Sequence, residues 1–211
     1  MKNKYFEITK DSIEKVNYII QNMDGSSFHN HYHILYDICS SLKNVTYVAI
    51  GSFAGGSASL VSLNENVKKI ISIDIGKPID KSIPIKNVNR FKHKECEYTY
   101  IEGDSKDKNT IEKLKMLVDS VDILFIDGDH TYNGVQSDFN NYSKFVKSGG
   151  YIVFDDYLDF NYSPDVKKFV DNLIKDISKD QYEIIGSLKY DEIRLTNSLK
   201  ESSNEFILKK I

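Results

Sequence analysis

Two short acidic motifs contain the residues of this sequence that are best suited to chemistry. The first, IDGDHTY, spans residues 126–132, and the second, FDDY, spans residues 154–157. Each motif follows an apolar run that is typical of a buried strand, residues 122–126 and residues 151–154. If these strands are neighbours, their ends bring four carboxylates and one imidazole into a small space.

Such crowding of acidic groups has a chemical consequence. Unpaired carboxylates that lie close together repel one another and raise one another's pKa. A hard divalent cation relieves the repulsion, and oxygen ligands suit Mg²⁺ or Mn²⁺. The motifs therefore predict a metal site. The alternative is a pair of acidic loops in water, but two apolar strands that each end in acids argue against it.

A glycine-rich turn, GSFAGGS at residues 51–57, lies between a predicted strand and a predicted helix. Open α/β sheets bind ligands at the carboxyl ends of their strands. Glycines there allow the backbone to approach a ligand, and the following helix offers free N–H groups. Phe53 stands where the dinucleotide fingerprint requires glycine, which disfavours a nicotinamide-dependent oxidoreductase. A purely structural turn is the alternative interpretation.

Two further strand ends carry polar residues. Asp74 ends the second predicted strand, about 20 residues past the glycine turn, where an acid typically accepts a hydrogen bond from a ribose hydroxyl. The alternative is a solvated acid at a strand end. Gly103, Asp104 and Ser105 follow the third predicted strand, and in this type of sheet that loop reaches the adenine of a cofactor. The alternative, which such a motif on its own more often indicates, is a simple turn.

Strand-like runs alternate with amphipathic helical patterns along the chain, which is typical of a mostly parallel sheet covered by helices. The predicted strands are residues 45–50, 69–74, 98–102, 122–126 and 151–154. The predicted helices are residues 9–22, 31–42, 58–64, 111–118 and 135–146, with one more that starts at residue 163. Two final strands, residues 182–188 and 205–208, have no helix between them and predict an antiparallel hairpin.

Individual residues sharpen some of these boundaries. Thr9 is a candidate cap for the first helix, and Ser163 is a candidate capping hydroxyl ahead of Pro164. Ser148-Gly149-Gly150 is expected to end a helix before the fifth strand. Residues 76–96 show little periodicity and predict a long connection with one short helix.

Length and composition indicate which classes of protein this sequence can belong to. The chain has 211 residues, which suits one domain, and its formal net charge of −3 gives no electrostatic footprint for nucleic acid. No secretory signal or membrane-length apolar run is apparent. Cys39 and Cys96 have no metal-ligand spacing. We therefore expect a cytoplasmic protein that binds neither nucleic acid nor membrane, while a homo-oligomer stays open.

At the acidic motifs the sequence resembles a known family. IDGDHTY followed by SGGYIVFDDY is similar to the class I methyltransferases that include sugar and macrolide O-methyltransferases, and YVAIGSFAGGSA is similar to their cofactor motif. The resemblance covers residues 45–157. It implies a Rossmann-like fold with a seven-stranded, mostly parallel sheet, a C-terminal antiparallel hairpin and helices on both faces. Residues 45–211 would form this core, with the helices of residues 1–44 on the acceptor side.

The resemblance also implies roles for particular residues. S-adenosylmethionine would bind over the first four strands, at Gly51, Ser52, Gly55, Gly56, Ser57, Asp74, Gly103, Asp104, Ser105 and Asp127. A divalent metal, Mg²⁺ or Mn²⁺, would be held by Asp127, Asp155 and Asp156. The catalytic base would be Asp129 or His130, since relatives use either position. Catechol-type relatives have Asp-Asn in place of the Asp155-Asp156 pair, which favours the sugar-modifying branch.

One position departs from the family pattern. Ala49 stands two residues before the first glycine, where the family usually has an acid that helps hold the polar end of the cofactor. This departure keeps a non-catalytic S-adenosylmethionine-binding protein as an alternative to an enzyme.

The predicted reaction is metal-dependent methylation of a hydroxyl on a small molecule, a sugar or a glycoside. We favour His130 as the base because its unperturbed pKa is near 6.5. Asp129 would need a raised pKa, which a nearby cation opposes.

Overall fold

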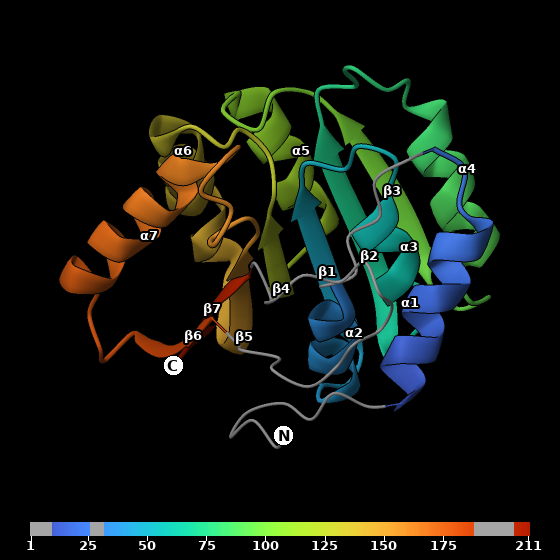
Figure 1. Cartoon of the computed structure of the whole chain (residues 1–211), viewed down its shortest axis with the longest axis horizontal. Helices are drawn as coiled ribbons and strands as arrows, with labels where there is room; N and C mark the ends of the chain where they lie inside the picture. Colours follow the sequence, from blue (N-terminus) through green and yellow to red (C-terminus); the bar gives the residue numbers. More distant parts are fainter. Residues whose placement is uncertain (1–9, 26–31, 188–204) are drawn as a thin grey trace.

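The computed structural model describes residues 10–25, 32–187 and 205–211, and it contains one seven-stranded sheet (Figure 1). The strand order is β3-β2-β1-β4-β5-β7-β6. The strands are β1 (Val45–Ile50), β2 (Val67–Asp74), β3 (Glu97–Glu102), β4 (Val121–Ile126), β5 (Val146–Phe154), β6 (Tyr182–Ser187) and β7 (Phe206–Lys210). The first five are parallel, and β7 runs antiparallel to both β5 and β6. This confirms the predicted topology and the terminal hairpin.

Helices cover both faces of the sheet, as predicted (Figure 1). They are α1 (Lys10–Asn22), α2 (His33–Ser40), α3 (Gly56–Val61), α4 (Ser82–Phe91), α5 (Lys108–Leu117), α6 (Tyr132–Tyr142) and α7 (Pro164–Asp176). Alternate residues of a strand point to opposite faces. In β1, Tyr47 packs into the apolar core under α1 to α4, and Val48 packs into the core under α5 to α7.

The position of β1 explains where the sheet opens. This strand lies between β2 and β4. After β1 the chain continues to β2 and β3 on one side of it, and then returns to β4 and β5 on the other side. A crevice forms at the carboxyl ends of the strands at such a switch point. Backbone hydrogen bonds extend the ladder one residue past the strands and so hold the loop starts side by side; they are Gly51 N to Ile73 O, Gly103 N to Asp74 O, Asp127 N to Ile50 O and Asp155 N to Ile126 O.

The boundary between α6 and β5 differs from the prediction. The helix ends at Tyr142, a 3-10 turn (Ser143–Phe145) follows, and β5 begins at Val146. The predicted continuation of the helix to Val146, with an end at residues 148–150, was therefore wrong. Val146 pairs with Val121 of β4 and is buried in the core. Its apolar side chain suits a buried strand position, and it also falls on the apolar face of the predicted helix, so the sequence pattern does not distinguish the two.

Two smaller points complete the comparison with the predicted elements. The connection of residues 76–96 contains one helix, α4, as expected. The predicted cap at Thr9 and helix start at His31 lie outside the described residues. In the part of the chain that the structure describes, no helix has the length and apolar character needed to cross a membrane.

Candidate active site

A pocket of about 510 Å³ opens at the carboxyl ends of the parallel strands. The loops after β1, β2, β3, β4 and β5 all contribute to its wall, and Tyr32 joins them from the segment before α2. The wall contains all of the predicted metal and catalytic residues and most of the predicted cofactor residues. They are Gly51, Ser52, Asp74, Gly103, Asp104, Ser105, Asp127, Asp129, His130, Asp155 and Asp156.

The turn after β1 comes very close to the end of β4, which explains its first glycine. Gly51 has φ of +84°, and a Cβ atom at this position would overlap the backbone carbonyl oxygen of Asp127. Gly55, Gly56 and Ser57 do not line the pocket, and Gly56 and Ser57 are buried in α3. Gly55 packs against Pro84 of α4. Their assignment to the cofactor stays a prediction.

Asp74 links the loop after β2 to the glycine-rich turn. Its Oδ2 accepts hydrogen bonds from the backbone N–H groups of Ser52, at 2.7 Å, and Phe53, at 3.1 Å. Its Oδ1 accepts from the N–H of Gly76 at 2.7 Å. Each carboxylate oxygen has two lone pairs, so the group retains capacity for a ligand hydroxyl. The backbone bonds hold this acid in place before any ligand arrives.

Asp138 lies behind the loop after β3. Ser105 Oγ donates to its Oδ1 at 2.6 Å, while Oδ2 has no hydrogen-bond partner among the described residues. Asp138 is only 1% exposed. This burial raises the pKa of its carboxyl to about 6.

Asp129 does not join the other acids at the end of β4. Lys106 Nζ lies 2.8 Å from Asp129 Oδ2, so this ion pair connects the loops after β3 and β4. The hydrogen bond from Lys106 keeps the pKa of Asp129 below its usual range. Of the four carboxylates expected to crowd together, Asp129 is thus the one that pairs with Lys106.

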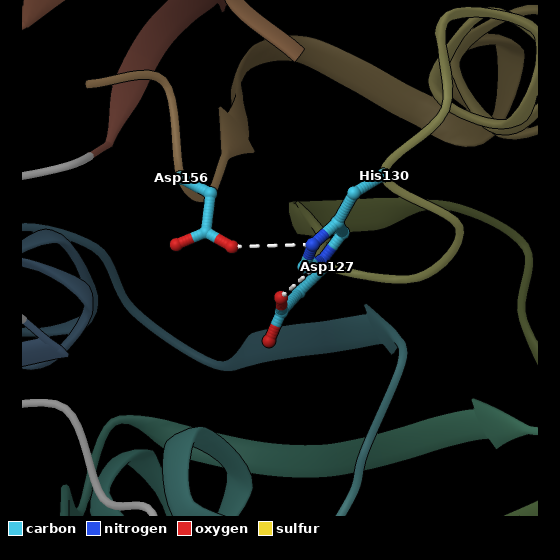
Figure 2. Close-up of side chains that lie close together, drawn as sticks. All are labelled: Asp127, His130 and Asp156. Carbon is cyan, nitrogen blue, oxygen red and sulfur yellow. Dashed lines mark hydrogen bonds and ion pairs between the residues drawn. The ribbon is translucent and has the colours of Figure 1, made fainter. Parts of the chain in front are cut away.

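Two of the remaining acids, Asp127 and Asp156, flank His130 (Figure 2). His130 Nε2 lies 3.3 Å from Asp127 Oδ1, and His130 Nδ1 lies 3.3 Å from Asp156 Oδ2. One ligand atom from each of these three residues falls within 4.8 Å of the others. Asp155 is not one of the three. It lies beside them, almost fully buried, with its Oδ2 3.4 Å from the Tyr32 hydroxyl, which is equally far from Asp127 Oδ2.

The crowding perturbs the protonation of this cluster. Burial, and then the negative charge of Asp155, raises the pKa of Asp127. The hydrogen bond to Asp127 raises the pKa of His130 despite partial burial. The expectation that His130 titrates near its unperturbed value was therefore wrong for the protein without a cation. The reason is that its ring sits between two carboxylates.

The donor set fits a hard divalent cation. The carboxylates of Asp127 and Asp156 offer oxygen atoms that fall, together with the imidazole of His130, within 4.8 Å of one another, and the carboxylate of Asp155 lies next to them. Asp156 also has φ of +55°, an unusual backbone conformation for a residue other than glycine. Such conformations are found at ligand sites, where the surrounding structure holds them in place.

Sequence reasoning missed two residues of the site. Tyr32 lies within the predicted helix of residues 31–42, just before α2 begins at His33, and the helical period does not indicate that its hydroxyl faces the acids. Ser163 was predicted to cap α7, but its hydroxyl makes no capping hydrogen bond. Instead it lies 2.9 Å from His130 Nδ1 and donates to Asp156 Oδ2 at 3.0 Å. No sequence signal indicates this choice of partner, because the three residues meet only in the folded chain.

Comparison with known proteins assigns the chain to a family. A family model described as a methyltransferase domain matches residues 48–157, from within β1 to the loop after β5. The chain belongs to this methyltransferase family. It is also 38% identical over 213 residues to "Uncharacterized protein R132" of Acanthamoeba polyphaga mimivirus, covering 94% of this chain and 95% of the relative.

Solved structures share the fold of this methyltransferase. An O-methyltransferase from Bacillus cereus in complex with S-adenosylhomocysteine has a TM-score of 0.60 at 12% identity, over 96% of this chain and 91% of that one. MycE, from the mycinamycin biosynthetic pathway, in complex with Mg and S-adenosylhomocysteine, has a TM-score of 0.62 at 18% identity. That match covers 96% of this chain and 55% of MycE.

The family assignment identifies the chain as an S-adenosylmethionine-dependent methyltransferase. The position at which the family usually has an acid, Ala49, is 1% exposed and packs into the core under α1 to α4. Acids do line the pocket at the ends of the two strands that flank β1: Asp74 at the end of β2 and Asp127 after β4.

Proposed function

We propose that this methyltransferase methylates a hydroxyl of a small molecule with the help of a divalent metal. The observation that carries the proposal is the cluster of Asp127, His130 and Asp156 in the wall of the same pocket that holds the predicted cofactor residues. An acceptor that reaches this cluster would also face a cofactor in the same pocket.

The cofactor end of the pocket would bind S-adenosylmethionine. Asp74 would accept from a ribose hydroxyl, which its fixed position favours. Asp104 and Ser105 would lie next to the adenine, in the loop that follows β3. The complexes of the B. cereus and MycE proteins with S-adenosylhomocysteine support this arrangement.

Asp127 and Asp156, with Asp155 beside them, would hold Mg²⁺ or Mn²⁺. When bound, such a cation lowers the pKa of a nearby hydroxyl. The chain's own contribution is to concentrate negative charge where the cation belongs, and the Tyr32 hydroxyl lies between two of the acids. The Mg named in the MycE complex supports a metal here.

We assign the base to His130. The ion pair with Lys106 lowers the pKa of Asp129, which makes that carboxylate a poor proton acceptor. His130 Nε2 faces Asp127, inside the cluster. In the proposed reaction the acceptor oxygen bonds to the methyl carbon as the carbon–sulfur bond breaks. The hydroxyl proton passes to His130, and S-adenosylhomocysteine leaves.

The acceptor class that we propose is a sugar or glycoside with neighbouring hydroxyls. The Asp155-Asp156 pair favours it, and the complex of MycE with mycinamycin VI is consistent with it. The test uses labelled S-adenosylmethionine and Mg²⁺ with a panel of methyl hexopyranosides, catechol, RNA and lysine peptides. We expect label on a glycoside. Transfer only to RNA or to lysine would contradict the proposal.

A non-catalytic cofactor-binding protein is the second candidate, and the buried Ala49 is the observation that favours it. Calorimetry with S-adenosylmethionine and with NAD, combined with the acceptor panel, separates the candidates. Binding of S-adenosylmethionine without transfer to any acceptor would favour the binding protein. Binding of NAD would favour an oxidoreductase. A cytoplasmic location remains part of the proposal, in keeping with the free thiols of Cys39 and Cys96.

A further inference from the structure

Ser163 has the position of a helix cap, but its hydroxyl is used elsewhere. It directly precedes Pro164 at the start of α7, and no helix N–H donates to its side chain. Thr131, at the same position before α6, shows the usual arrangement: its hydroxyl accepts from the N–H of Gly134 at 3.1 Å. Ser163 is also 1% exposed, so its hydroxyl is not directed to solvent.

The hydroxyl of Ser163 instead connects His130 to Asp156. It donates its one hydrogen to Asp156 Oδ2 at 3.0 Å, and it lies 2.9 Å from His130 Nδ1. A hydroxyl whose hydrogen is already donated still has lone pairs with which to accept. The consistent arrangement is that His130 Nδ1–H donates to Ser163, which donates in turn to Asp156.

We propose that Ser163 is a positioning residue that keeps the proton of His130 on Nδ1 and directs Nε2 toward Asp127. This inference rests on the proposed function, in which His130 is the base. The partner of one ring nitrogen fixes the tautomer and the orientation of the imidazole. With Nδ1 engaged by Ser163, Nε2 is the nitrogen that takes the proton of the acceptor hydroxyl.

The test compares Ser163→Ala, Ser163→Cys and Ser163→Thr with the unmodified chain. Ala and Cys remove the strong hydroxyl hydrogen bonds, whereas Thr retains them. Ser62→Ala is the matched control, because Ser62 is also buried and its hydroxyl bonds a backbone carbonyl, that of Ser59, at 2.7 Å. All proteins are labelled with ¹⁵N-histidine, and His130 is assigned from the spectrum of His130→Gln.

Nitrogen resonances of the His130 ring are recorded with Mg²⁺ and S-adenosylhomocysteine present. We expect Nδ1 to be protonated in the unmodified protein, in Ser163→Thr and in Ser62→Ala, and to lose this fixed state in Ser163→Ala and Ser163→Cys. With the best methyl glycoside, kcat of the Ala and Cys variants should fall by roughly 10- to 100-fold, as for other groups that orient a functional imidazole. KM and the affinity for S-adenosylhomocysteine should not change.

Two results would overturn the inference: unchanged His130 resonances in both Ser163→Ala and Ser163→Cys, or an equal loss of kcat in Ser62→Ala. Melting curves identify a variant that fails to fold. If either Ser163→Ala or Ser163→Cys does not fold, the resonances and kcat of the other one decide whether the inference holds. If the unmodified protein methylates no member of the panel, the proposed function fails, but the resonances still test whether Ser163 sets the tautomer of His130.

Discussion

The two ends of the pocket satisfy their carboxylates in different ways. At the cofactor end, Asp74 receives three backbone N–H groups, so its charge is fully supported by the folded chain. At the acceptor end, Asp127 and Asp156 flank the imidazole of His130, and Asp155 lies beside them with its Oδ2 3.4 Å from the Tyr32 hydroxyl. The carboxylate at the first end is held by backbone donors, whereas the carboxylates at the second end lie close together, and burial and the charge of Asp155 raise the pKa of Asp127.

This difference indicates what each end requires from a ligand. The cofactor end needs only a hydrogen-bond donor that fits an existing acceptor. The acceptor end gains from positive charge, because burial and then the negative charge of Asp155 raise the pKa of Asp127, and a nearby cation would offset both effects. Substitutions at the two ends should therefore affect different properties.

The largest effect should come from metal removal. Excess chelator should abolish methyl transfer to a glycoside while leaving S-adenosylhomocysteine affinity nearly unchanged, because the metal serves the acceptor. Asp156→Asn should behave in the same way. Transfer assays and calorimetry on the same samples measure the two quantities. Full turnover in excess chelator would show that the acidic end works without a cation.

Loss of the base should have the next largest effect. His130→Ala should lower kcat by about 10²- to 10⁴-fold, the range for a lost general base, while Mg²⁺ still binds. Asp129→Asn is the matched comparison and should keep most of the activity, because Asp129 is paired with Lys106. Single-turnover rates with Mg²⁺ check both variants. An active His130→Ala and an inactive Asp129→Asn would move the base to Asp129.

At the cofactor end, Asp74→Ala should weaken S-adenosylhomocysteine binding by about 1.5–3 kcal/mol, the value of a charge-assisted hydrogen-bond site. The melting temperature should also fall, because three backbone N–H groups lose their acceptor. Titration calorimetry and thermal melts measure the two effects. Mg²⁺ affinity serves as the internal control. Unchanged cofactor affinity would remove Asp74 from the site.

The smallest effect concerns Asp138, a buried acid behind the loop after β3. Its pKa of about 6 lies above that of an unfolded aspartate, so the folded state favours the protonated form. The stability that it contributes is present below about pH 4 and is lost as the pH rises through about 6. Asp138→Asn keeps an acceptor for Ser105 and should be more stable than the unmodified protein at pH 7.5, by on the order of 1–2 kcal/mol.

Melting curves between pH 4 and pH 7.5 check the Asp138 prediction. The advantage of Asp138→Asn should disappear near pH 4, and Asp119→Asn, at an exposed position, is the comparison substitution. An advantage of equal size at every pH would mean that packing, and not protonation, separates the two proteins.

The sequence predicted the strand ends better than the partners of the side chains. Strand β1 was predicted to the residue, because its continuous apolar run and the glycine after it leave one interpretation. Val146 was misassigned because one apolar residue fits two periods. The pairing of Asp129 with Lys106 and of Ser163 with His130 joins loops that are distant in the chain. Such pairings depend on loop geometry, which has no local sequence signal.

The most direct test of the account is a calorimetric titration of Mg²⁺ into the protein saturated with S-adenosylhomocysteine. We predict that one ion binds per chain, and that Asp127→Asn and Asp156→Asn lose this binding while still binding S-adenosylhomocysteine. Asp74→Ala should retain the binding of Mg²⁺. Absence of Mg²⁺ and Mn²⁺ binding in the unmodified protein, or equal binding in the two aspartate variants, would contradict a metal at the acidic end of the pocket.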